Sequence, residues 1–185
     1  MAASWNRIAR RIRVPLGFAF AALFLWLARP TLPFVVLSLA LVAPGLWLRG
    51  YASGYVKKNA ELTVTGPYGW TRNPLYLGSM MIAFGFALAA RSVWIAGALV
   101  LLFAAIYIPV IRGEEEHLRA QFPEFAAYAA TVPRLLPKMA GRSGSGTPKG
   151  GFSGALYRQH REYNALLGAA GVYAALILKV VLRKS

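Results

Sequence analysis

The stretch NPLYLGSMMIAFGFALAARSVWIAGALVLLFAAIYIPVI, residues 73–111, decides the fold class because it contains a single charged residue, Arg91. Arg91 divides it into two uncharged runs, residues 73–90 and 92–111. A helix that crosses a membrane needs about 20 apolar residues, within a range of roughly 17 to 25. The sequence therefore predicts a hairpin of two membrane-spanning helices, joined by a turn at Arg91 that is too short to hold a site.

Three further runs contain no Asp, Glu, Lys or Arg: residues 14–28, 30–48 and 163–178. The first and last are short, but flanking basic side chains can lie along the helix and reach water. A cleavable signal peptide is the competing interpretation of the first run, and it is disfavoured because a second span follows without a clear cleavage site. With 57% hydrophobic residues, the chain is predicted to be an all-α integral membrane protein with five transmembrane helices.

The formal net charge of +15 would suit a nucleic-acid-binding protein, but the distribution of the basic residues favours another explanation. Most of them lie before the first predicted span, between the second and third, or between the fourth and fifth, whereas only Arg29 and Arg91 occupy the alternate loops. This bias is typical of cytoplasmic loops. We therefore expect an N-terminus and two large loops on the cytoplasmic side of a bacterial inner membrane, contact with membrane lipids, and no nucleic-acid partner.

Several kinds of chemistry are excluded by residues that the chain lacks. There is no Cys and no Asp, so disulfides, thiolate catalysis, Asp-dependent triads and the usual Mg²⁺-dependent phosphoryl-transfer sites are absent. No glycine-rich pattern follows a predicted strand, which argues against a Rossmann domain. His117 and His160 are too few and too far apart to indicate a metal site.

Three consecutive carboxylates, Glu114, Glu115 and Glu116, follow the fourth predicted span. The helical pattern continues beyond them until Pro123, so this span is expected to extend into the cytoplasm. In one interpretation the carboxylates form a solvated helix face with Arg112 and Arg119, stabilised by about 0.2–0.5 kcal/mol for each i,i+4 pair. In the other they point toward the first cytoplasmic loop and bind a ligand.

That loop ends in GPYGWTRNPLYLG, residues 66–78. The segment could be a turn with an interfacial aromatic belt, in which Arg72 binds a lipid phosphate. It could also form the wall of a binding pocket, because its tyrosines combine aromatic faces with polar tips. Either segment alone is a weak signal.

Together the two segments resemble the isoprenylcysteine carboxyl methyltransferase and phospholipid methyltransferase superfamily. Members of that superfamily carry a G-x-Y…R-H-P-x-Y-x-G turn, and one helical hairpin later the pattern E-E-x-x-L-x-x-x-F-x-x-Y-x-x-Y-x-x-x-V-P-R-x-x-P. This chain has EEEHLRAQFPEFAAYAATVPRLLP at residues 114–137. The resemblance covers residues 45–137, with Asn73 in place of the usual His, Phe125 in place of the first Tyr, and Pro123 in place of a usual Gly.

The resemblance implies a methyltransferase that uses S-adenosyl-L-methionine and binds it at the cytoplasmic interface without a Rossmann domain. It places eight residues around the cofactor: Leu62, Thr63, Tyr68, Asn73, Pro74, Leu75, Tyr76 and Glu114. Glu115 is a further candidate catalytic residue, and Arg112 and Arg134 are candidates to hold an acceptor carboxylate or phosphate. Asn73 cannot act as an acid or base, which leaves the identity of the acceptor open.

The expected reaction is methyl transfer by in-line displacement to a lipophilic acceptor, such as an isoprenylcysteine-like carboxylate, a lipid amine or a small molecule. Two alternatives are an NADPH-dependent membrane reductase of the sterol-reductase type and a non-enzymatic protein that binds lipid. The predicted organisation is a membrane core over residues 1–138, a flexible Gly/Ser linker over residues 139–156, and a basic segment with the last transmembrane helix over residues 157–185.

Overall fold

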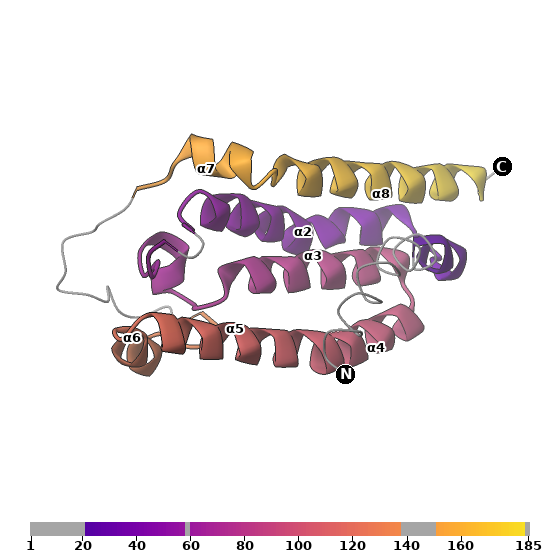
Figure 1. Ribbon diagram of the computed structural model, residues 1–185. Helices are drawn as coiled ribbons and strands as arrows, with labels where there is room; N and C mark the ends of the chain where they lie inside the picture. The colour runs from indigo at the N-terminus through magenta and orange to yellow at the C-terminus, as the bar shows by residue number, and fades with distance from the viewer. Residues whose placement is uncertain (1–20, 58–59, 138–150, 184–185) are drawn as a thin grey trace, which may run out of the picture.

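The computed structural model describes residues 21–57, 60–137 and 151–183, and these are helical or irregular, with no strand. The long helices lie side by side in a bundle (Figure 1). After a short helical segment over residues 21–27, the elements are α2 (Leu32–Ser53), the 3₁₀ turn η1 (Gly66–Gly69), α3 (Pro74–Ala90), α4 (Val93–Leu102), the π-turn η2 (Phe103–Tyr107), α5 (Ile108–Gln121), α6 (Phe125–Thr131), α7 (Gly154–Gln159) and α8 (Tyr163–Leu182).

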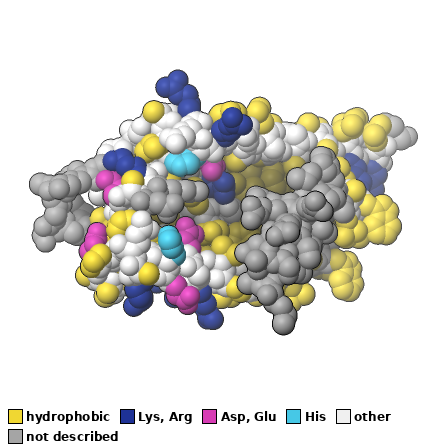
Figure 2. Space-filling model, in the orientation of Figure 1, with side chains coloured by type: hydrophobic (Ala, Val, Ile, Leu, Met, Phe, Trp, Pro, Cys, Tyr) yellow, Lys and Arg dark blue, Asp and Glu magenta, His cyan; other side chains and the backbone are white. Residues whose placement is uncertain are grey.

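Three helices in the described part of the chain are long and apolar enough to cross a membrane: α2, the continuous helix Val93–Gln121, and α8. Helix α3 has the predicted position but only 17 residues, the lower end of the spanning range. Residues 14–20 of the first predicted span lie outside the described residues. Figure 2 shows most of the visible charged side chains near the end that holds α6 and α7, while exposed hydrophobic side chains dominate the opposite end. The structure is that of an integral membrane protein, and five spans remain a prediction.

The pairing of α2 with α3 depends on glycines. A Cβ atom on Gly78 would lie 2.8 Å from the Gly45 carbonyl oxygen, and a Cβ on Gly45 would lie 2.9 Å from the Gly78 carbonyl oxygen. Gly85 is equally close to α2, because its Cβ would lie 2.5 Å from a methyl carbon of Val42. Small residues let two helix backbones approach closely inside a membrane. The glycines thereby fix the distance between the two helices that carry the loop at residues 66–73.

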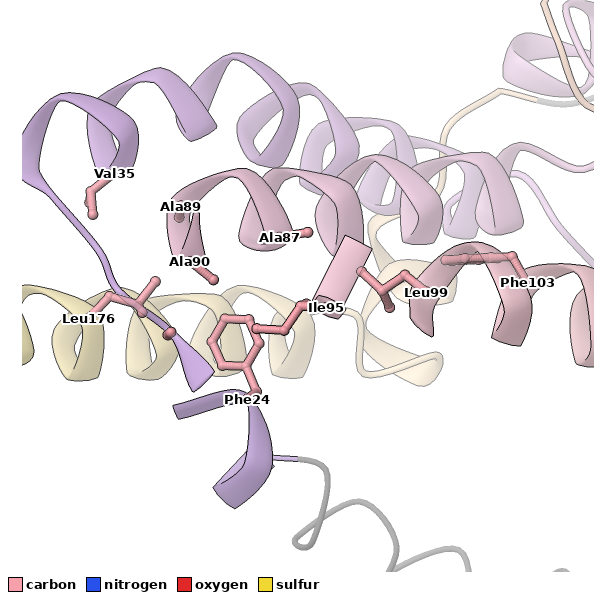
Figure 3. Packing of buried hydrophobic residues seen from close by; sticks show 10 residues of the cluster. Phe24, Val35, Ala87, Ala89, Ala90, Ile95, Leu99, Phe103 and Leu176 are labelled. Atoms are coloured by element: carbon pink, nitrogen blue, oxygen red, sulfur yellow. The ribbon is translucent and has the colours of Figure 1, made fainter. Parts of the chain in front are cut away.

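The apolar core gathers at the end of the bundle far from that loop. Phe24, Ile95 and Leu99 pack with Leu176 of α8 and with alanines at the end of α3 (Figure 3). Arg91 forms the turn between α3 and α4 in the left-handed conformation, with φ of 51°, and its guanidinium lies over the ring of Phe34. The predicted turn at Arg91 between two apolar helices is therefore confirmed, whereas a membrane span at α3 stays a prediction.

The helix from Val93 to Gln121 is 29 residues long, which confirms that the fourth predicted span continues beyond its apolar part. It contains a π-turn, in which the Ile108 amide donates to the Phe103 carbonyl, directly before Pro109. A proline lacks the N–H that an α-helix needs, so a local change of this kind lets the helix continue. The helix ends at Gln121, and α6 begins at Phe125, so the predicted break at Pro123 is also confirmed.

The C-terminal helices lie along α2 (Figure 1). The Ser153 amide donates to the Gly54 carbonyl oxygen at 2.9 Å, and the Ser153 hydroxyl accepts from the Leu156 amide at the start of α7. Lys179 of α8 donates to the carbonyl oxygens of Leu25 and Trp26. A cation is favourable at the C-terminus of a helix, which gives Lys179 a structural role in the bundle.

Candidate functional site

A polar cavity of about 510 Å³ lies where the loop before α3 meets α5 and α6. Its volume is within the roughly 300–1,000 Å³ of small-molecule sites. Of the residues that the sequence places at a site, eight line this cavity: Leu62, Thr63, Tyr68, Asn73, Leu75, Tyr76, Glu114 and Glu115. Pro74 is buried at the start of α3. Arg112 is exposed and does not line the cavity, and Arg134 lies behind Glu115.

Glu115 is a buried carboxylate at the centre of a cluster of charges, and its residue is only 6% exposed. One of its carboxylate oxygens accepts from Arg134 Nε at 3.0 Å and from a terminal nitrogen of Arg134 at 2.8 Å. The other lies 3.2 Å from Arg72 Nε, an ionic contact without hydrogen-bond geometry. The carboxylate raises the pKa of the Arg134 guanidinium. Glu115 therefore pairs across the fold, and the i,i+4 pair with Arg119 does not form.

Residues 71–73 are held against residues 133–134 by three hydrogen bonds, and a fourth joins Asn73 to Glu115. The Arg72 amide donates to the Pro133 carbonyl oxygen at 2.9 Å. The Asn73 side chain donates to the Arg134 carbonyl oxygen at 2.9 Å and to Glu115 at 3.4 Å, while the Thr71 hydroxyl donates to the same Arg134 carbonyl. The two segments recognised as motifs in the sequence thus contact each other directly. Asn73, which is 7% exposed, lines the cavity from this joint.

Glu114 has a different environment from Glu115. Its residue is exposed, and its carboxylate accepts a hydrogen bond from the Tyr76 hydroxyl at 3.0 Å. None of the ion pairs among the described residues includes Glu114. The Tyr76 ring meets the Tyr107 ring edge to face, with centroids 5.6 Å apart. The cavity therefore offers a carboxylate without a cationic partner beside two aromatic rings.

A buried tyrosine, Tyr68, a half-buried one, Tyr128, and the threonine Thr63 complete the polar wall. The Tyr128 hydroxyl donates to the Tyr68 carbonyl oxygen at 2.7 Å. Burial raises the pKa of both phenols, and the charge of Glu114 raises that of Tyr68 further, so both stay neutral at physiological pH. The Thr63 hydroxyl is buried and has no hydrogen-bond partner among the described residues. An unpaired buried hydroxyl is costly, so this oxygen is suited to a bound ligand.

Sequence reasoning missed a second group of residues at the cavity: Arg49 on α2, Ser79 on α3, and Glu162 before α8. The Arg49 side chain donates to both carboxylate oxygens of Glu162, at 3.0 and 3.1 Å, and to the Ser79 hydroxyl. Arg49 and Glu162 are 113 positions apart in the chain, and each lies in a segment where a charged residue is ordinary. Nothing in their spacing indicates that they meet.

An apolar cavity of about 640 Å³ adjoins the polar one. It lies between the residue 21–27 segment, α3, α4 and α8, and it shares Arg49 and Ser79 with the polar cavity. The helices thus line two spaces of opposite character with a common boundary. No group of three or more His, Cys, Asp or Glu in the described residues could hold a metal ion.

The phospholipid methyltransferase family model matches residues 33–124 of this chain. These residues contain α2, the loop between α2 and α3, α3 itself and the long helix. Residues 125–137 and the C-terminal helices lie outside that match. No solved structure matches the chain.

Two curated proteins are similar over part of their length. The nickel-cobalt-cadmium resistance protein NccN of Alcaligenes xylosoxydans is 35% identical over 62% of this chain and 54% of its own length. The cobalt-zinc-cadmium resistance protein CzcN of Cupriavidus metallidurans is 35% identical over 66% of this chain and 56% of its own length. In each case the similar region spans little more than half of the relative.

Proposed function

Because residues 33–124 belong to the phospholipid methyltransferase family, we propose that this protein is a membrane methyltransferase that uses S-adenosyl-L-methionine and modifies a lipophilic acceptor. One observation carries the proposal. A polar cavity with a carboxylate that has no ion-pair partner, Glu114, adjoins an apolar cavity between the helices, and Arg49 and Ser79 line both. A water-soluble cofactor and a lipid-like acceptor can then meet at the common boundary.

The residues of the polar cavity fit the proposed cofactor. S-adenosylmethionine supplies a methyl group bonded to a positively charged sulfur. Glu114 offers an uncompensated negative charge, and Tyr76 and Tyr107 offer ring faces, which also favour cations. The unpaired Thr63 hydroxyl can bond to a polar group of the ligand. Leu62, Leu75 and Tyr68 line the remaining wall, and Asn73 is held in place by its bonds to Arg134 and Glu115.

Residues of this chain position the two reactants and exclude water. Glu115, Arg72 and Arg134 tie α5 to the segment that opens α3, which holds Asn73 and Tyr76 in fixed places. A displacement reaction depends mainly on holding its two partners in line. Glu115 acts in this proposal as a positioning residue, because its oxygens are already engaged. The apolar cavity holds the acceptor tail, and the site lies on the cytoplasmic side of the membrane.

Calorimetric titration of S-adenosylmethionine into the full chain in nanodiscs tests the proposal. The wild type should bind saturably, and Glu114→Gln should weaken binding about tenfold or more, because a hydrogen bond to a charged group contributes about 1.5–3 kcal/mol. Glu116→Gln is the matched control, since Glu116 is exposed on the same helix and does not line the cavity. Absence of binding at millimolar cofactor by folded protein would contradict the proposal, and saturable binding of NADPH would favour the reductase alternative.

A further inference from the structure

Arg49 is the single charged residue among the described residues that line the apolar cavity, and Ser79 is the single hydroxyl-bearing one. The rest of the lining consists of Ala, Gly, Val, Leu, Ile and Phe. An amphiphile whose tail occupies this cavity can place its headgroup favourably only at the end where Arg49 and Ser79 lie. That end is also the boundary with the polar cavity.

Glu162 holds the Arg49 guanidinium from the opposite side. It lines the polar cavity but not the apolar one. Its two oxygens accept from Arg49 Nε at 3.1 Å and from a terminal nitrogen at 3.0 Å, and the Glu162 and Arg49 side chains are 12% and 25% exposed. A paired carboxylate of this kind fixes the plane of the guanidinium. The apolar cavity therefore ends at an oriented cation and a hydroxyl, without a facing carboxylate.

The Arg49 guanidinium, which lines both cavities, retains one N–H donor that no hydrogen bond to a described residue engages. An arginine has five N–H donors, and the described residues engage four of them: two through Glu162, one through Ser79 and one through the Leu75 carbonyl oxygen. The Ser79 hydroxyl donates to that carbonyl as well, so its proton is already engaged. The donor left on Arg49 suits an acceptor oxygen with a negative charge.

From this geometry we propose that Arg49 is a specificity residue, which binds an anionic oxygen, of a carboxylate or a phosphate, on the headgroup of the lipophilic acceptor. Glu162 is its positioning residue and moderates its charge. The inference rests on the proposed methyltransferase function and adds the residues, Arg49 and Glu162, that select the headgroup of the acceptor. Glu162 lies outside residues 33–124, so this selection depends on a part of the chain beyond the family match.

Competition between tail-matched probes tests the inference. Oleate, oleyl phosphate and oleyl alcohol are mixed in equal amounts with the full chain in detergent at pH 9, and the bound ligands are counted by native mass spectrometry. The wild type should prefer the two anions over the alcohol by about tenfold, the effect of one hydrogen bond to a charged group. The ratio of oleate to oleyl phosphate shows which anion fits better.

The variants separate recognition from a structural role. Arg49→Gln should bind the three probes nearly equally, whereas Glu162→Gln should raise the preference for anions several-fold, because the guanidinium loses its partner. Arg49→Lys should keep part of the preference. The inference is overturned if the wild type shows no preference, or if Arg49→Gln weakens all probes by the same factor. If Arg49→Gln does not fold, the test depends on Glu162→Gln. An unchanged preference of that variant for the anionic probes over oleyl alcohol also contradicts the inference.

The two proposals can fail separately. Binding of S-adenosylmethionine is measured on the same wild-type sample. Cofactor binding without a headgroup preference overturns the role of Arg49 and leaves the methyltransferase proposal standing. Absence of cofactor binding by the wild type contradicts the methyltransferase proposal, whichever of the three probes binds best.

Discussion

Glu114 and Glu115 are neighbours in the chain, yet they have opposite environments. Glu115 is buried with two arginines and an asparagine around it, whereas Glu114 is exposed at the cavity and bonds to one tyrosine. Successive positions on a helix point about 100° apart, so one faces the joint between α5 and the loop while the other faces the cavity. Glu115 thus stabilises the fold, whereas Glu114 is available to a ligand.

Replacing Glu115 should destabilise the protein far more than replacing Glu114. Glu115→Gln removes the counter-charge of Arg72 and Arg134, and breaking a buried ion pair costs about 3–5 kcal/mol, with Arg134 half exposed placing this case at the lower end. Glu114→Gln should cost less than about 1 kcal/mol, since only one exposed hydrogen bond changes. Thermal unfolding of both variants in detergent measures the difference, and equal melting temperatures would contradict the buried cluster.

Tyr128 should make the protein sensitive to alkaline pH. Burial raises its pKa above the ordinary value near 10, so the stability linked to its neutral form is present below pH 10 and is lost as the pH rises toward the folded-state pKa. Between pH 9 and pH 11, ionisation of this phenol in the unfolded state lowers the free energy of unfolding by about 1.4 kcal/mol. The unfolding free energy of the wild type should therefore fall by about that much more than that of Tyr128→Phe over the same interval. Parallel losses in the two proteins would show that Tyr128 is not buried in this way.

At the scale of elements, the boundaries of α3, the continuation of the long helix beyond its apolar part and the break at Pro123 all follow from the sequence. Charge-free runs and prolines act locally, so a single sequence reveals them. The contacts of Arg49 with Glu162 and of Arg72 with Glu115 depend on which helix faces meet. Spacing along the chain does not reveal these contacts, because it reports only neighbours on the same element. The same limit explains why Arg112 was expected at the site although it is exposed.

The α2–α3 pairing can be tested with two glycines. A methyl group at Gly78 would meet the α2 backbone 2.8 Å away, whereas one at Gly97 would meet nothing within 4 Å. Gly78→Ala should destabilise the fold by about 1–3 kcal/mol through overpacking. Gly97→Ala should be neutral or should stabilise α4 by up to about 1 kcal/mol, as alanine favours helix. Thermal unfolding in detergent compares the two, and a tolerated Gly78→Ala would contradict the close approach of α2 and α3.

For the whole molecule, the arrangement separates a polar end, where two distant motifs form one cavity, from an apolar bundle with large exposed hydrophobic side chains. The all-helical fold could be predicted, and eight of the eleven expected site residues line one cavity, because the paired motifs carry that information. That these residues bind a ligand stays a prediction. The apolar cavity and its boundary could not, because they arise from the packing of α8 against α3 and α4. That packing joins segments without any recognisable motif.

Photoaffinity mapping with an azido analogue of S-adenosylmethionine tests directly whether the polar cavity binds the cofactor. The full chain in nanodiscs is labelled, digested and analysed by mass spectrometry, with unlabelled S-adenosylmethionine as the competitor. If the polar cavity binds the cofactor, competed labelling should fall in residues 60–76 and 107–128, the two segments that meet at that cavity, and it should be weaker in Glu114→Gln. Labelling that the competitor does not reduce, or competed labelling confined to other segments, would show that the cofactor does not bind there.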